Sequence, residues 1–172
     1  MGLHTSDNSV LYDRSLHRTI EGPIDVNRCT TQQSWYGYFQ ENMDALGLPT
    51  PASWHATATT VTGTLSTLAA ISEKFGPRVT VGELVQAGSK TEILLVAAGI
   101  SASWYLGAAI GSAAVATGNY TSCGSRMSDV FTYARMHGLL TPRITHHLLA
   151  HPEIYEVTQK GRNTYGLFAR MA

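Results

Sequence analysis

The feature that most constrains this chain is an uncharged run of thirty-three residues, from Ile93 to Ser125, that contains no Asp, Glu, Lys, Arg or His. Inside the run small residues recur at every fourth position, at Gly99, Ser103, Gly107 and Gly111. Positions four apart share one face of an α-helix, so these residues would form a flat surface on which a second backbone can lie closely. We call them the small-residue stripe, and the run predicts a helix over 93–116 that packs through it.

Two environments suit such a helix. At 1.5 Å per residue it would be about 36 Å long, which is enough to cross a hydrocarbon core of about 30 Å. It would fit equally well at the buried centre of a helical bundle, where glycines permit close packing. Its strongly apolar aliphatic side chains are few and favour insertion by only about 2–5 kcal/mol together. We therefore expect a helix that is first stored in a water-soluble fold and inserts conditionally, and not a permanent anchor.

A second stretch, from Ala45 to Ser72, has no formal charge, and His55 is its one titratable side chain. On a helix over 54–71 the apolar face would carry Val61, Leu65 and Leu68. The neighbouring face would carry a row of hydroxyls, which we call the threonine row: Thr57, Thr60, Thr64 and Thr67. Hydroxyls can replace part of an ion's water shell, so the row is a candidate pore lining. Because β-branched residues lower helix propensity, a solvent-exposed helix or a strand is the alternative.

Shorter elements are predicted around these two stretches. The predicted helices cover 34–46, 80–87 and 128–140, with a fourth that begins at Thr141-Pro142. After Ile154 the pattern alternates around Lys160-Gly161, which suggests a small β-hairpin. Residues 1–31 predict an irregular lead-in.

These elements together predict a single domain over 1–172 that is mainly α. We expect a helical bundle around a central apolar helix, with a helical hairpin over 54–118, an amphipathic region over 126–172 and a small C-terminal β-hairpin at most. The chain has 12 basic and 12 acidic residues and a formal charge of zero, with no basic stripe that could neutralise phosphates. Nucleic acid is therefore excluded as a predicted partner. The polar N-terminus predicts no cleavable signal peptide.

Candidate catalytic and metal-binding residues are few. His147 and His151 have the i, i+4 spacing of a two-histidine metal pair, but no Glu follows His147 and Pro152 ends the segment. We therefore predict no metal and no cofactor. Cys29 could act as a nucleophile with His55 or His137 as its base, in a tract that resembles the cysteine-bearing helix of cell-wall amidases. Those enzymes need their histidine on a sheet, and no segment with a strand pattern carries one here.

The small-residue stripe in a chain without a predicted signal peptide resembles the glycine-zipper, membrane-depolarising effectors of bacterial type VI secretion systems. The resemblance covers mainly residues 93–118. It implies a toxin without enzymatic activity that inserts into the inner membrane of a rival cell from the periplasm. There it would self-associate through the stripe and pass small ions along a path lined by Thr60, Thr64 and Thr67.

The resemblance also implies partners and a route. The expected partners are the target bilayer, further copies of the chain, a cognate immunity protein and a secretion-tube carrier. The expected route is secretion without a cleaved signal, with the protein soluble before insertion. Two alternatives stay open at this point: a cysteine-dependent, amidase-like cell-wall effector, and a non-catalytic soluble adaptor or immunity protein.

Overall fold

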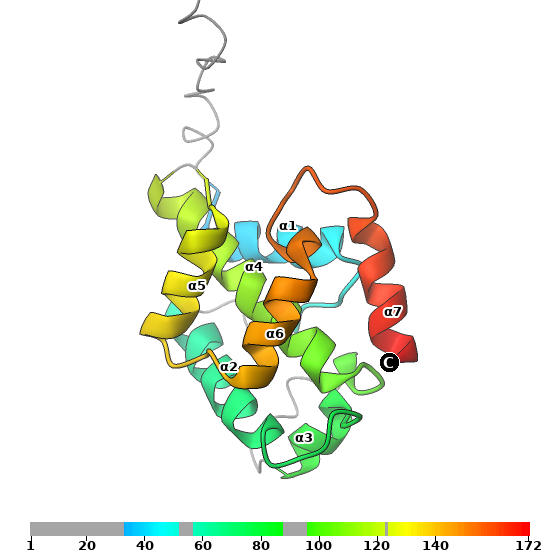
Figure 1. Cartoon of the computed structure of the whole chain (residues 1–172). Coiled ribbons are helices and arrows are strands. Elements are labelled where there is room, and N and C mark those ends of the chain that lie inside the picture. The colour runs from blue at the N-terminus through cyan, green and yellow to red at the C-terminus, as the bar shows by residue number, and fades with distance from the viewer. Residues whose placement is uncertain (1–32, 52–56, 88–95, 123) are drawn as a thin grey trace, which may run out of the picture.

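The computed structural model describes residues 33–51, 57–87, 96–122 and 124–172, and every structural statement below concerns these ranges. They contain seven α-helices and two 3₁₀ turns (Figure 1). The helices are α1 (Trp35–Ala45), α2 (Ala58–Ser72), α3 (Val81–Ala87), α4 (Ala102–Ser122), α5 (Met127–Met136), α6 (Pro142–Ala150) and α7 (Tyr165–Met171), and the 3₁₀ turns are η5 (Pro152–Ile154) and η6 (Arg162–Thr164). The prediction of a mainly α fold is confirmed. The lead-in expected over 1–31 lies outside the described residues.

Helix α4 lies at the centre of the bundle. Helices α1, α2, α5 and α6 all pack against it, and α1 crosses it on one side (Figure 1). Every residue from Tyr105 to Ala116 is buried. A helix can be covered on all sides in this way because none of its side chains carries a charge that needs water. The other helices bury one face each, as the amphipathic pattern of α1 predicts.

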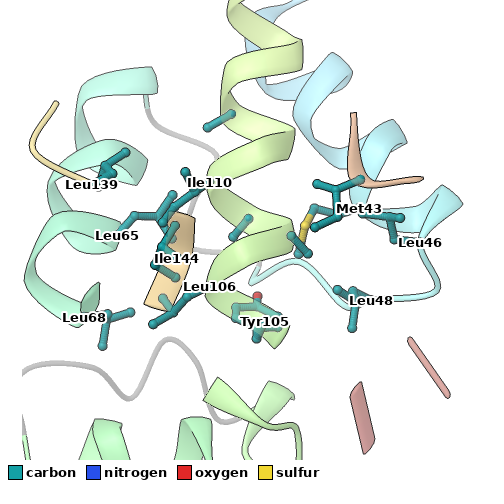
Figure 2. Packing of buried hydrophobic residues seen from close by; sticks show 14 of the residues in the cluster. Met43, Leu46, Leu48, Leu65, Leu68, Tyr105, Leu106, Ile110, Leu139 and Ile144 are labelled. Atoms are coloured by element: carbon teal, nitrogen blue, oxygen red, sulfur yellow. The ribbon is translucent and has the colours of Figure 1, made fainter. Parts of the chain in front are cut away.

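The apolar core has two halves, one on each side of α4 (Figure 2). On one side lie side chains from α1 and the segment that follows it: Met43, Leu46 and Leu48. On the other side lie side chains from α2, the α5–α6 connection and α6: Leu65, Leu68, Leu139 and Ile144. The apolar face predicted for α2 is therefore the face that is buried against α4.

The predicted helix over 93–116 is displaced in the structure, since α4 begins at Ala102 and continues to Ser122. A backbone pairing between residues 79–82 and 98–102, which we call the clasp, stops the helix from starting earlier. Its bonds are Gly82 N to Ala98 O (3.0 Å), Val81 N to Ile100 O (2.9 Å) and Ala102 N to Val79 O (2.8 Å). Because the carbonyls of 98 and 100 are used by the clasp, the chain before Ala102 turns away from the helix axis. Residues 93–95 lie outside the described ranges.

Local signals place the helix starts. Ser34 begins α1 by accepting a hydrogen bond at Oγ from the backbone of Gly37 (3.1 Å). The predicted capping box opens α3: Thr80 N donates to Glu83 Oε2 (2.7 Å), and Glu83 N donates to Thr80 Oγ1 (3.3 Å). The backbone N–H of Thr80 and its hydroxyl (2.9 Å) both donate to the carboxylate, which lowers the pKa of Glu83. The predicted helices over 34–46 and 80–87 are therefore confirmed.

The small β-hairpin expected after Ile154 does not form, and helix α7 takes its place. Gly161 adopts a left-handed backbone conformation with φ +83°, and Thr164 Oγ1 donates to its carbonyl (2.7 Å), which starts η6. In α7 the residues Tyr165, Gly166 and Ala169 are buried while Leu167 and Phe168 are exposed. This spacing of buried residues is helical. The alternating pattern in the sequence is too short to favour a β-strand over this helix.

Candidate functional site

The small-residue stripe is split by the fold. Gly107 and Gly111 are buried on α4, and Ser103 lies half-buried in its first turn. A methyl group at Gly107 would overlap the ring of His147, and one at Gly111 would overlap the side chain of Ile154. Gly99 lies in the turn before α4 and faces open space. Three of the four predicted residues therefore share one helix, and two of these pack directly on α6 and η5.

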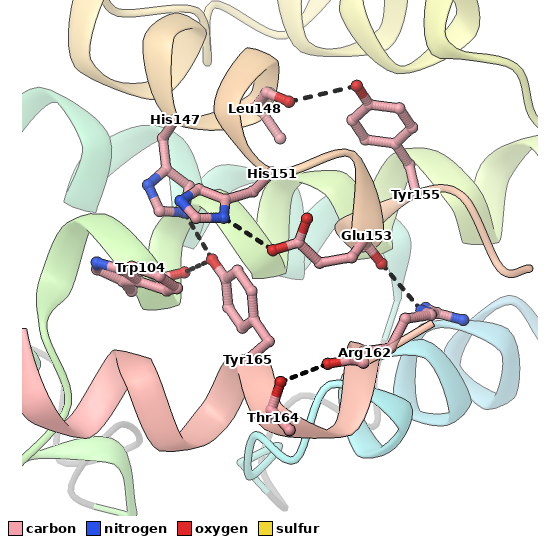
Figure 3. Close-up of polar contacts among 10 residues, drawn as sticks. Trp104, His147, Leu148, His151, Glu153, Tyr155, Arg162, Thr164 and Tyr165 are labelled. Atoms are coloured by element: carbon pink, nitrogen blue, oxygen red, sulfur yellow. Dashed lines mark hydrogen bonds and ion pairs between the residues drawn. The ribbon is translucent and has the colours of Figure 1, made fainter. Parts of the chain in front are cut away.

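Helix α6 and turn η5 lie over the stripe, and we call them its cover. A buried hydrogen-bond chain holds the cover in place (Figure 3). His147 Nε2 lies 2.6 Å from the hydroxyl of Tyr165, which donates its proton to the carbonyl of Trp104 (2.8 Å). Since a tyrosine hydroxyl has one proton, His147 must donate from Nε2, which assigns its tautomer. Burial lowers the pKa of His147 to about 3, and positive charge on His151 or His146 would lower it further. A neutral histidine thus joins α6 and α7 to α4.

His151 completes this cluster at the end of α6. Its ring centroid lies 4.4 Å from those of Trp104 and His147, and its Nδ1 lies 2.8 Å from Glu153 Oε1 (Figure 3). The two histidines with metal-pair spacing are therefore engaged with aromatic rings, a tyrosine and a carboxylate. Within the described ranges, no three His, Cys, Asp or Glu side chains are grouped so that they could hold a metal ion.

The threonine row lies away from the stripe, on the outer side of α2. Thr57, Thr60 and Thr67 are exposed and Thr64 is half-buried. Thr57 caps the helix by accepting a bond from the backbone of Thr60 (3.2 Å). Thr64 and Thr67 donate to the carbonyls four residues earlier, at 2.9 and 3.0 Å. The row is thus helical and continuous, and these bonds keep it close to the helix surface.

A second set of hydroxyls lines a groove of about 690 Å³ between α1, α2, α4 and α5, and no role was predicted for them from the sequence. Thr62 donates to the carbonyl of Ala58 (2.7 Å) and therefore accepts the proton of Tyr133 (2.7 Å). On the same groove Trp35 Nε1 donates to Thr117 Oγ1 (2.9 Å). In the sequence, Thr62 follows Val61 on the apolar face of α2. This position could have indicated a distant polar contact, because a buried hydroxyl needs a hydrogen-bond partner.

The residues of the enzyme alternative are only partly described. Cys29, His55 and Cys123 lie outside the described ranges. His137 is exposed at the end of α5, with its ring centroid 4.5 Å from that of Tyr133. The part of the chain that the structure describes forms no sheet on which a histidine could stand beside a cysteine-bearing helix.

Comparison with known proteins adds no family to this description. No family model, curated protein or solved structure matches the chain. Among the helices in the described ranges, none is both long and apolar enough to cross a membrane.

Proposed function

We propose that this chain is an antibacterial toxin that inserts into a target-cell membrane, self-associates through α4 and conducts small ions, which dissipates the membrane potential. One observation carries the proposal: α4 has no charge along its length, and its stripe is covered by later elements of the same chain. A surface on which Gly107 and Gly111 admit a neighbour too close for a methyl group can admit a second helix in the same way.

The proposed change exchanges one partner of α4 for another. In the bundle, α6 and η5 lie on the stripe through His147 and Ile154. When they leave, the stripe can pack against the stripe of a second copy. At 1.5 Å per residue α4 is about 32 Å long, close to the thickness of a hydrocarbon core. Association supplies the contacts that a helix rich in Ala, Gly and Ser lacks as an isolated span.

In this proposal Thr60, Thr64 and Thr67 line the ion path. Thr64 and Thr67 already give their hydroxyl protons to carbonyls of α2, so oxygen lone pairs remain to face outward. Such oxygens favour cations over anions, because they can replace water in a cation's hydration shell. We therefore propose that the path conducts small cations.

Delivery and partners follow from the resemblance to glycine-zipper effectors. The chain would reach the periplasm of the target cell on a secretion-tube carrier and act on the inner membrane from that side. A cognate immunity protein would protect the producing cell.

The experiment is a measurement of membrane potential in a bacterial cell that directs the chain to its own periplasm. We expect depolarisation, reported by a potential-sensitive dye, before growth stops. Purified protein added to vesicles with an imposed potassium diffusion potential should collapse that potential. A chain that is toxic without depolarising the cell contradicts the proposal, and loss of that toxicity in Cys29→Ala would favour the amidase-like alternative.

A matched pair of variants tests the stripe without disturbing the bundle. Gly99 and Gly76 both face open space and have no positive φ, so leucine at either position should leave the fold intact. Only Gly99 belongs to the stripe, and although it precedes α4 in the bundle, the proposed insertion extends the helix back over it, as the sequence pattern over 93–116 predicts. We expect Gly99→Leu to weaken depolarisation and Gly76→Leu to leave it unchanged. Gly107→Leu is unsuitable, because displacement of His147 would disturb folding and membrane activity together.

A further inference from the structure

Arg162 carries a charge that the described residues do not neutralise. The residue is half-buried, yet its guanidinium meets two neutral oxygens: Nε donates to the carbonyl of Glu153 (2.9 Å), and a terminal nitrogen donates to Asn42 Oδ1. No carboxylate of the described residues lies within ion-pair distance of it. A guanidinium stays protonated even when it is partly buried. A half-buried charge that is solvated only in part and has no ion-pair partner favours the binding of an anion.

The guanidinium is held in position by a buried amide. Asn42 Nδ2 donates to Ser112 Oγ (2.8 Å) and to the carbonyl of Ile154 (2.9 Å). Both amide protons are therefore used, and the Asn42 oxygen must face Arg162. The network joins α1, α4, η5 and η6, which lie far apart in the sequence. Arg162 is thus oriented before any ligand arrives, which lowers the entropy cost of binding.

Arg162 forms part of the wall of a pocket of about 580 Å³. Two of its five N–H donors are used by Glu153 and Asn42, and the other three have no partner among the described residues. The amide of Asn119 and the hydroxyl of Thr158 line the same pocket and have no partner among the described residues. This is more donors than the two oxygens of a carboxylate need, and it suits the three oxygens of a phosphate.

A negative charge lies in the same pocket. Glu41 is one of the lining residues, and its carboxylate acts on Arg162 from beyond ion-pair distance. Burial lowers the pKa of Arg162, and Glu41 opposes that shift. Because the two groups share a pocket without touching, a ligand with opposite charges at its two ends would pair with both.

We infer that this pocket binds a small zwitterion of the phosphoethanolamine type, with its phosphate on Arg162 and its ammonium against Glu41. Asn119 and Thr158 donate to the remaining phosphate oxygens. The same group occurs free in solution and as the headgroup of phosphatidylethanolamine. The inference stands on Arg162 and Glu41 and does not depend on ion conduction.

The test is titration calorimetry of the full chain with O-phosphoethanolamine, inorganic phosphate and ethanolamine as separate probes. We expect saturable binding of phosphoethanolamine, weaker binding of phosphate, and little binding of ethanolamine. Arg162→Gln should lower the affinity at least about tenfold. Glu41→Gln should lower the affinity for phosphoethanolamine but not that for phosphate, which should stay the same or rise because a negative charge leaves the pocket. The matched control is Arg170→Gln on α7, which should bind like the parent chain.

A second variant guards against a folding effect, because Arg162→Gln also breaks the bond to Asn42. Asn119→Asp adds a negative charge to the pocket without touching that network, and it should lower the affinity for phosphate and phosphoethanolamine alike. The inference is overturned if no probe binds at millimolar concentration, or if folded Arg162→Gln and Asn119→Asp both bind like the parent. Equal effects of Glu41→Gln on phosphate and phosphoethanolamine would overturn the zwitterion assignment.

Vesicles separate the two sources of the ligand and keep this inference distinct from the proposed function. Cosedimentation with phosphatidylethanolamine vesicles, but not with phosphatidylcholine vesicles, assigns the lipid headgroup if Arg162→Gln removes it. Binding of free phosphoethanolamine without cosedimentation assigns the soluble compound. Phosphoethanolamine binding by a chain that never depolarises a membrane would support this inference and contradict the proposed function. Depolarisation by a chain that does not bind phosphoethanolamine would support the proposed function and contradict this inference.

Discussion

Helices α2 and α4 have similar compositions but differ in how far they are buried. Both lack charged residues, and both contain glycine and several hydroxyl side chains. Helix α4 is buried on all sides from Tyr105 to Ala116, whereas α2 buries the face that carries Val61 and Leu65 and exposes Thr60 and Thr67. An uncharged composition thus permits a helix to be buried on every side but does not require it. Helix α4 is surrounded by more helices than α2, and for this reason α4 is buried all round while α2 is buried on one face.

Glycine shows the difference most clearly. Gly63 in α2 faces open space, while Gly107 and Gly111 in α4 leave no room for a methyl group. In α2 the glycine is only an entropic cost to the helix. In α4 the same residue type is required by packing against α6 and η5. The comparison can be tested by paired substitutions.

The largest effect is expected from truncating an apolar side chain of α4. Ile110 is fully buried, so Ile110→Ala should lower the free energy of unfolding by about 2–5 kcal/mol. Thr67→Ala, on the exposed face of α2, should change it by less than about 0.5 kcal/mol. Urea denaturation of both variants measures the contrast. Similar losses at the two sites would mean that α2 is covered in solution on the face that is exposed here.

Acid should loosen the cover of α4 through His147. Its pKa is about 3 in the fold and about 6.5 when unfolded, so between these values the unfolded chain binds the extra proton. Stability from this group is present above pH 6.5 and is lost as the pH falls toward 3, by up to about 1.4 kcal/mol per pH unit. Denaturant midpoints against pH, for the parent and His147→Gln, isolate this contribution.

The control for acid sensitivity is His137→Gln at the exposed end of α5, because His137 is not among the charges that act on His147. It should follow the parent curve, whereas His147→Gln should show a shallower pH dependence. A steep curve that persists in His147→Gln would assign the acid sensitivity to carboxylates instead.

A smaller loss is expected from filling the stripe. In Gly111→Ala the added methyl group must displace the side chain of Ile154, which should cost about 1–3 kcal/mol despite the better helix propensity of alanine. Thermal unfolding monitored by circular dichroism checks the direction. A stabilised Gly111→Ala would show that α6 and η5 do not lie on the stripe in solution.

The smallest effect has the opposite sign. Gly63→Ala in α2 places a methyl group in open space inside a helix, so it should raise the free energy of unfolding by about 0.5–1 kcal/mol. The same denaturation series measures it. Loss of stability at this position would show that another surface packs against Gly63.

Elements with local signals could be predicted from the sequence. The serine that begins α1, the Thr80–Glu83 box and the Thr141-Pro142 start of α6 act within a few residues, and each occurs where expected. The central helix was also predictable, because an uncharged run of this length is expected either at the buried centre of a bundle or in a membrane.

Features that depend on distant partners could not be predicted. The clasp interrupts a run with a helical pattern through bonds between residues 79–82 and 98–102. The helix α7 is favoured by the fit of Tyr165 under Trp104, which no local pattern encodes. Arg162 and Asn42 meet across 120 positions of sequence. The threonine row was the visible pattern, whereas Thr62, which lies between Thr60 and Thr64 on the buried side of α2, makes the buried contact.

The order of elements along the chain has a consequence for synthesis. The stripe on α4 is covered by α6 and η5, and the bonds from Tyr165 to Trp104 and from Ser101 to Ala169 require α7. All of these covering elements follow α4, and a ribosome adds about 5–20 residues per second. For a few seconds in each round of translation, α4 is therefore outside the ribosome before the elements that cover its stripe have emerged. A nascent chain therefore exposes the small-residue stripe to other molecules before its own later helices can cover it.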